Sequence, residues 1–164
     1  MTIGHAMERL KKILVPTDFS RCSETALELA SELAESFGAT IDLLHVWDAP
    51  PFISPETMVG AIGESQTLAN LVKRQAESQM EKFVESARAK GFPVKAVRIE
   101  HGAPAPTIVD VAKQGDYDLV ALGTHGRTGL SHLVIGSVAE KVVRYSDRPV
   151  LTVRDVKPDD SRPD

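Results

Sequence analysis

Short apolar runs alternate with longer amphipathic segments along most of the chain. The runs are rich in β-branched side chains and too brief for helices, which is typical of buried strands. Between them, apolar residues recur every three or four positions, which predicts helices packed on a sheet. Strands are predicted at 12–16, 40–47, 94–100, 118–122 and 148–153, and helices at 20–38, 66–91, around 108–112 and at 137–146.

Local signals mark where several of these elements begin and end. Ser20 is a candidate N-cap for the first helix, and Gly38 is a candidate stop for it. Residues 48–65 hold prolines and glycines without periodicity, which predicts a long loop, and such loops are often functional. In the second helix, a stripe of apolar residues indicates a core-facing side rather than a partner-binding face. This stripe consists of Leu68, Val72, Ala76, Met80, Phe83 and Ala87.

The alternation of strands and helices predicts an α/β fold. Its sheet should be parallel and open, with five strands and with four helices distributed over both faces by right-handed crossovers. The length of 164 residues favours a single domain. Residues 1–8 are expected to be disordered or a tag, and residues 155–164 to form a solvated polar tail.

Composition and charge narrow the possible partners. A net charge of −4 without clustered Lys and Arg argues against a nucleic-acid binder. The sequence has neither an apolar run long enough to span a membrane nor a secretory signal, so we expect a cytoplasmic protein without a membrane role. Cys22 is the only cysteine, which excludes intrachain disulfides, and we interpret it as a small residue in the first helix.

A glycine-rich stretch lies between the fourth predicted strand and the last helix. It runs Gly123-Thr124-His125-Gly126-Arg127-Thr128-Gly129, followed later by Gly136-Ser137. Glycines allow a ligand to approach the backbone and permit positive φ angles, and a helix start offers unpaired N–H groups to an anion. The pattern Gly-x2-Gly-x9-Gly-Ser is neither the dinucleotide fingerprint nor the Walker pattern. We therefore interpret it as a phosphate-binding loop of another type.

This stretch resembles the signature of the universal stress protein family, in its ATP-binding branch. The resemblance is strong over 118–153, where the closing strand reads Pro149-Val150-Leu151-Thr152-Val153, and extends more loosely over 9–154, which we take as the single domain. It implies a Rossmann-like fold of the adenine nucleotide alpha hydrolase type, with strand order 3-2-1-4-5. Ligands bind where such an order reverses, which places Asp18 opposite Gly123.

The resemblance also implies a set of nucleotide-binding residues from the ends of three strands and from the glycine loop. Those matched to adenosine are Pro16, Thr17, Asp18, Val46, Leu122 and Gly123, those matched to the phosphates are Gly126, Arg127, Gly136, Ser137 and Val138, and Thr124 and His125 lie between the two groups.

Judged from the residues alone, four of these positions could have roles that do not involve a nucleotide. Asp18 could cap the first helix, and Val46 could be a core valine. Arg127 could be solvated, and His125 could make a backbone hydrogen bond rather than act as a general base.

The sequence lacks the usual signs of catalysis and of a protein-ligated metal. The histidines show no His-x-x-x-His spacing, and no Gly-x-Ser-x-Gly elbow is present. Any Mg²⁺ would be carried by phosphates. We therefore predict no catalytic residues and a binding protein for ATP or AMP. One alternative is a slow ATPase or an autophosphorylating enzyme, with Ser137, Thr124 or Thr128 as acceptor, and another is a nucleotide-free interaction module.

Family members of this kind dimerise through the last strand. Val150, Leu151 and Val153 lie on that predicted sheet edge, so the resemblance implies a homodimer. The loop at 48–65 is a candidate for partner specificity, although nothing in it identifies the protein partner.

Overall fold

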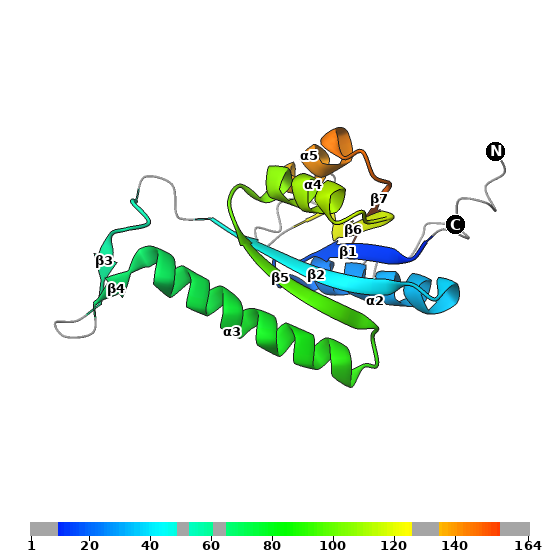
Figure 1. Cartoon of the computed structure of the whole chain (residues 1–164), viewed down its shortest axis with the longest axis horizontal. Coiled ribbons are helices and arrows are strands. Elements are labelled where there is room, and N and C mark those ends of the chain that lie inside the picture. The colour runs from blue at the N-terminus through cyan, green and yellow to red at the C-terminus, as the bar shows by residue number, and fades with distance from the viewer. Residues whose placement is uncertain (1–9, 49–52, 61–64, 126–134, 155–164) are drawn as a thin grey trace, which may run out of the picture.

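Five parallel strands form one open sheet in the computed structural model, which describes residues 10–48, 53–60, 65–125 and 135–154. The strands follow the order β5-β2-β1-β6-β7, which confirms the expected order 3-2-1-4-5 under another numbering (Figure 1). All four neighbouring pairs are parallel. Their bounds are β1 (Lys12–Pro16), β2 (Thr40–Trp47), β5 (Val94–His101), β6 (Leu119–Gly123) and β7 (Val150–Val153).

Helices cover both faces of this sheet, as predicted. One core lies between the sheet and α2 and α3, and a second lies between the sheet and α4 and α5. Figure 1 shows α4 and α5 above the strands and α3 below them. The bounds of the helices are α2 (Arg21–Phe37), α3 (Leu68–Ala89), α4 (Pro104–Gln114) and α5 (Ser137–Tyr145).

The central strand β1 shows why the sequence folds this way. Ile13 faces the α2–α3 core and Leu14 faces the α4–α5 core, and both side chains are fully buried. A strand with helices on both faces requires a continuous apolar run, which is what residues 12–16 provide.

The ends of α2 confirm the capping signals. The Ser20 hydroxyl accepts a hydrogen bond from the Ser23 backbone N–H, and Gly38 adopts the left-handed conformation with φ 64°. The Ala39 N–H then reaches back to the Ala34 carbonyl at 2.8 Å, which satisfies a carbonyl in the last turn. Cys22 is buried in the first turn of α2, as expected for a small structural residue.

The segment predicted as a loop at 48–65 contains structure. A short antiparallel hairpin pairs β3 (Met58–Val59) with β4 (Gln66–Thr67). The Thr57 carbonyl accepts the Leu68 N–H at 2.8 Å, so this segment caps the start of α3. The loop prediction was wrong here, because strands of two residues are too short to produce a recognisable pattern.

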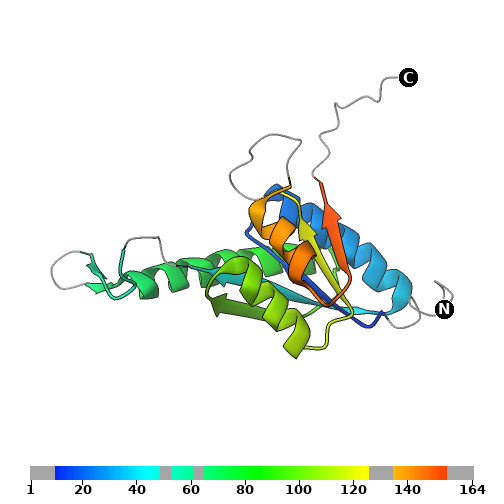
Figure 2. The same cartoon turned by 90° about the horizontal axis from the view of Figure 1, so that it is seen from above.

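The hairpin and the start of α3 extend beyond the sheet (Figures 1 and 2). Ala76, Met80 and Ala87 are buried and Phe83 packs against the core, as the apolar stripe predicted. Leu68 and Val72 are only half-buried, because the sheet does not reach the first turns of the helix. The core prediction was therefore right for most of α3 and wrong for its N-terminal end.

The predicted N-terminal segment 1–8 and the polar tail 155–164 lie outside the described residues. Within the described part of the chain, no helix has the length and apolar character needed to cross a membrane.

Candidate functional site

A cavity of about 240 Å³ lies at the carboxyl ends of β1, β2 and β6. This is the point where the strand order reverses between β1 and β6, the usual ligand position in open α/β sheets. All of the predicted site residues that the structure describes line this cavity. They are Pro16, Thr17, Asp18, Val46, Leu122, Gly123, Thr124, His125, Gly136, Ser137 and Val138.

Two further predicted residues, Gly126 and Arg127, lie outside the described residues, as does Thr128. Their assignment to phosphate and to autophosphorylation stays a prediction.

The turn between β1 and α2 forms one wall of the cavity. The Thr17 side chain is buried, with its hydroxyl 2.9 Å from that of Ser23. The Asp18 carboxylate accepts the Ser20 N–H at 3.0 Å while also lining the cavity. Ser20 is the N-cap of α2, so Asp18 does not cap the helix itself but braces the turn before it while lining the cavity.

Two glycines bring the opposite wall together. The Thr124 carbonyl accepts the Gly136 N–H at 2.6 Å, which joins the end of β6 to the start of α5. A Cβ atom on Gly136 would lie 2.9 Å from that carbonyl oxygen, and one on Gly123 would lie 2.9 Å from the Cys22 backbone. Both distances are closer than side chains tolerate.

From the sequence, these glycines are expected to allow a ligand to approach the backbone and to adopt positive φ. Positive φ is found elsewhere in the described chain but at neither Gly123 nor Gly136, and Gly136 has φ −63°. The expectation of positive φ was therefore wrong at both positions. Close approach of neighbouring backbone is what requires glycine there.

The N-terminus of α5 opens onto the cavity. Gly136 is the N-cap and provides no side-chain hydrogen bond. The first intrahelical bond runs from the Glu140 N–H to the Gly136 carbonyl, so the N–H groups of Ser137, Val138 and Ala139 precede the helical ladder. None of the three has a hydrogen-bond partner among the described residues, and all three residues line the cavity. These donors and the helix dipole favour an anion.

His125 forms a polar pair with its neighbour. Its Nδ1 lies 2.8 Å from the Thr124 hydroxyl, and its Nε2 is buried without a partner in the part of the chain that the structure describes. A buried ring nitrogen without a partner is uncommon. Among the described residues, the pair thus leaves the Nε2 atom of His125 without a partner beside the cavity.

The rest of the lining is mainly apolar, and the sequence analysis missed several of its residues. Ser23 could have been noticed because it lies three residues after the Ser20 cap. The residues from α4 gave no local signal, because their place depends on how α4 packs beside β2 and α5. The missed residues are Ser23, Leu44, Pro104, Ile108 and Ala139.

The described residues show no centre for a metal. No group of three or more His, Cys, Asp or Glu side chains lies close enough together among them to hold an ion. Asp18 is the one carboxylate among the described residues that line the cavity.

Taken together, fold and site define a doubly wound α/β protein with a cavity at its topological switch point. The chain belongs to the universal stress protein family, whose model matches residues 9–154.

Individual relatives agree with this assignment. The chain is 34% identical over 147 residues to universal stress protein MJ0531 of Methanocaldococcus jannaschii, covering 90% of this chain and 84% of that protein. It resembles the solved structure of MJ0577 from the same organism with a TM-score of 0.69 at 32% identity, covering 90% of this chain and 98% of the other. It also resembles UspA of Lactobacillus plantarum, with a TM-score of 0.69 at 25% identity and coverage of 89% and 99%.

Proposed function

We propose that this protein binds ATP or AMP in the cavity and acts as a nucleotide-responsive stress or signalling factor rather than as a turnover enzyme. The observation that carries the proposal is the start of α5, where three N–H groups have no partner among the described residues. Such a helix end is a ready anion site.

The remaining lining suits the other half of a nucleotide. Val46, Leu44 and Ile108 provide apolar lining from β2 and α4, of the kind that a purine base requires. Asp18 and Thr17 add polar groups between strand and helix that could orient a ribose or base. The donor set therefore fits an adenine nucleotide, with phosphates at α5.

Two solved universal stress proteins that share this fold hold an adenine nucleotide. One solved structure is in complex with cAMP, and another, from Archaeoglobus fulgidus, is in complex with dAMP. These proteins are 22% and 21% identical to this chain, so the likeness itself concerns the fold. They make an adenine nucleotide the natural ligand class to test first.

Binding without turnover can still transmit a signal. A nucleotide that favours one arrangement of the cavity walls shifts the protein towards that arrangement, in proportion to its difference in affinity for the two states. Any Mg²⁺ would enter with the phosphates, because the described lining offers one carboxylate only.

A homodimer through β7 is part of the proposal. In the described chain β7 pairs with β6 alone, so one side of its backbone is unpaired. Val153 is buried within its own subunit, and Leu151 and Val150 pack partly on the two cores. The contact would therefore depend on strand backbone more than on these side chains.

Light scattering at micromolar concentration tests the dimer. The Pro149 and Val153 carbonyls face β6, so alternation along the strand turns the Thr152 N–H to the open edge. Thr152→Pro should give a monomer and Thr152→Val a dimer, because proline removes that donor without breaking the β6–β7 ladder. A wild-type monomer would refute this part of the proposal.

A charge at the start of α5 tests nucleotide binding. Val138 is an exposed residue in the first turn, so Val138→Glu adds a negative charge where the helix dipole tolerates it and a phosphate does not. We expect calorimetry to show ATP affinity about 100-fold lower, or about 2.7 kcal/mol. The melting temperature should be unchanged or slightly higher.

Val138→Gln is the matched control, because it has the same shape without the charge. It should bind ATP within about threefold of wild type, a difference below 1 kcal/mol. Equal binding by wild type and Val138→Glu would exclude α5 as the phosphate site. If the wild type bound no ATP, ADP or AMP, the interaction-module alternative would replace the proposal.

The enzyme alternative retains one specific observation in its favour. The Thr124 hydroxyl lies 2.8 Å from His125 Nδ1, within the range of a nucleophile and its base. Thr124 is buried, however, and His125 Nε2 has no orienting partner among the described residues. Incubation with MgATP followed by mass spectrometry tests this: a phosphate on Thr124 that is lost in His125→Gln would establish autophosphorylation.

A further inference from the structure

The turn between β1 and α2 contains an unusual backbone conformation. Phe19 has φ 64°, in the left-handed region that bulky residues rarely adopt. Such conformations persist when the surroundings enforce them, and they are concentrated at functional sites. Phe19 directly follows Thr17 and Asp18, which line the cavity.

Polar contacts within the turn and from β2 hold the turn in place. The Phe19 N–H donates to the Thr17 hydroxyl at 3.0 Å, and the Ser20 N–H donates to the Asp18 carboxylate at 3.0 Å. His45 Nδ1 lies 2.8 Å from the Thr17 carbonyl oxygen. The positions of the Thr17 and Asp18 side chains are therefore coupled to the backbone of this turn.

The Phe19 ring holds the turn from the opposite side of the sheet. It packs against the α2–α3 core, whereas the cavity is bordered by residues of the α4–α5 core. Its centroid lies 4.3 Å from the His45 ring and 5.8 Å from the Phe83 ring, which it meets edge to face. The same His45 thus contacts both the ring of Phe19 and the carbonyl of Thr17.

We propose that Phe19 is a positioning residue for the nucleotide site. Its ring anchors the turn on the α2–α3 face, and its left-handed backbone thereby holds Thr17 and Asp18 against the cavity on the other face. The inference deepens the proposed function and rests on it for the identity of the ligand. Phe19 itself need not touch the nucleotide, since it is absent from the cavity lining.

The test compares two phenylalanines of one groove. Phe19 and Phe92 both line a groove between α2 and α3, and both pack on the same core, but the β1–α2 turn contains only Phe19. Phe19→Ala should weaken ATP binding about tenfold in calorimetry, whereas Phe92→Ala should stay within about twofold despite a comparable loss of melting temperature. Phe19→Leu, which keeps an apolar anchor, should recover most of the affinity.

Amide hydrogen exchange supplies a readout that needs no ligand. The Phe19 and Ser20 amides should exchange faster in Phe19→Ala than in Phe92→Ala, because their acceptors belong to the turn itself. Equal exchange and equal ATP affinity in the two variants would overturn the proposal. A wild type that binds no nucleotide would refute the proposed function alone, and the exchange comparison would then decide whether Phe19 positions the turn.

Discussion

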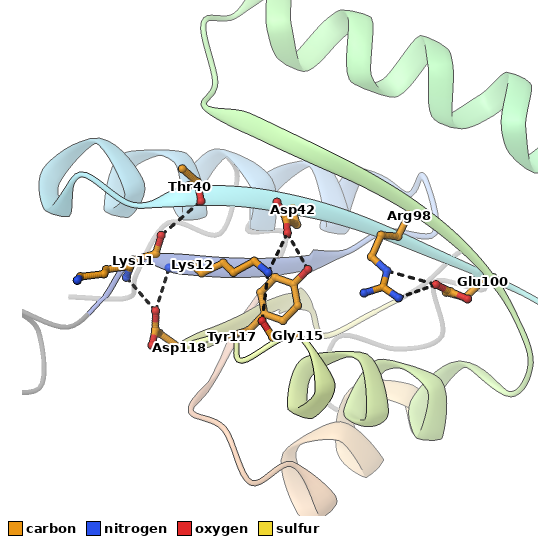
Figure 3. Close-up of polar contacts among 9 residues, drawn as sticks. All are labelled: Lys11, Lys12, Thr40, Asp42, Arg98, Glu100, Gly115, Tyr117 and Asp118. Carbon is orange, nitrogen blue, oxygen red and sulfur yellow. Dashed lines mark hydrogen bonds and ion pairs between the residues drawn. The ribbon is translucent and has the colours of Figure 1, made fainter.

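The two ends of the central sheet differ in how many of their polar groups bond within the fold. At the carboxyl ends of the strands, the first N–H groups of α5 and the Nε2 atom of His125 have no partner among the described residues. At the amino ends, polar side chains bond to one another and to nearby backbone groups (Figure 3), although the buried Asp42 Oδ1 also has no partner among the described residues. In the proposed function, the groups without a described partner at the carboxyl ends serve the ligand, whereas most of the polar groups at the amino ends bond within the fold.

The amino-end cluster joins segments far apart in the sequence. The buried Tyr117 hydroxyl donates to Asp42 Oδ2 at 2.7 Å, and Lys12 Nζ lies 3.5 Å from the same oxygen and 4.2 Å from the centre of the Tyr117 ring. The Asp118 carboxylate accepts the N–H groups of Lys11 and Lys12. These contacts tie the start of β1 to β2 and to the entry of β6.

Stability and nucleotide binding should therefore depend on opposite ends of the sheet. Changes at the amino end should alter the free energy of unfolding and leave nucleotide affinity unchanged, since the cluster lies across the sheet's length from the cavity. Changes at the start of α5 should do the reverse. Gly123 and Gly136 are exceptions, because they line the cavity but are required for the close packing of backbone around β6 and α5.

The largest effect is expected at Gly123, one of these exceptions. Gly123→Ala places a Cβ atom 2.9 Å from the Cys22 backbone, so the backbone of α2 or of β6 must shift to relieve the contact. We expect a loss of about 3 kcal/mol in the free energy of unfolding, measured by urea denaturation. If stability were unchanged and ATP binding alone were lost, Gly123 would serve ligand approach, and the packing explanation would fail.

The second largest effect is expected at Tyr117, near the amino ends of the strands. Tyr117→Phe removes the hydroxyl that donates to Asp42 and leaves this buried carboxylate with Lys12. We expect a loss of about 2 kcal/mol in unfolding free energy at neutral pH, because a buried acceptor loses its partner. Calorimetry of the same variant should give wild-type ATP affinity within about twofold; a larger change would mean that the two ends are coupled.

Tyr117 should also make the free energy of unfolding depend on pH. Burial, together with the Asp42 carboxylate, raises the pKa of Tyr117 to about 12. The unfolded state therefore ionises first, so the stabilisation is complete below about pH 10 and is lost as the pH rises towards 12. Urea denaturation across this window should show the wild-type advantage over Tyr117→Phe shrinking; a constant difference would contradict the assigned cause.

Those parts of the fold that depend on local pattern were predictable from the sequence. The buried run of β1, the Ser20 cap and the Gly38 stop each have a short-range cause, and the structure has all three. The β3–β4 hairpin was missed because each strand has two residues. The Tyr117–Asp42 contact was missed because it joins positions 75 residues apart, and no periodicity reports a single long-range hydrogen bond.

The site shows the same division. Positions such as Asp18 and Val138 were predictable because the family resemblance is carried by contiguous stretches at strand ends. Ile108 was missed because its place in the lining depends on how α4 packs, and its helical periodicity indicates core alone. Gly123 lines the cavity as expected, but its φ is not positive, and the sequence cannot show that Cys22 lies against it.

The smallest predicted effect concerns a single hydrogen-bond donor, the Ser137 N–H, at the start of α5. Ser137 is the first residue of α5, and Gly136 before it has φ −63° and ψ 149°, an extended conformation that can precede proline. Ser137→Pro should therefore fold normally, because proline suits the first helical position, while removing one N–H and the hydroxyl from the cavity. Ser137→Ala removes the hydroxyl alone. We expect ATP affinity to fall about fivefold in the proline variant, or about 1 kcal/mol, and by less in the alanine variant. If both variants lost the same affinity in calorimetry, the effect would be due to the hydroxyl. If both variants bound ATP as tightly as the wild type, the phosphates would not lie at this end of the helix.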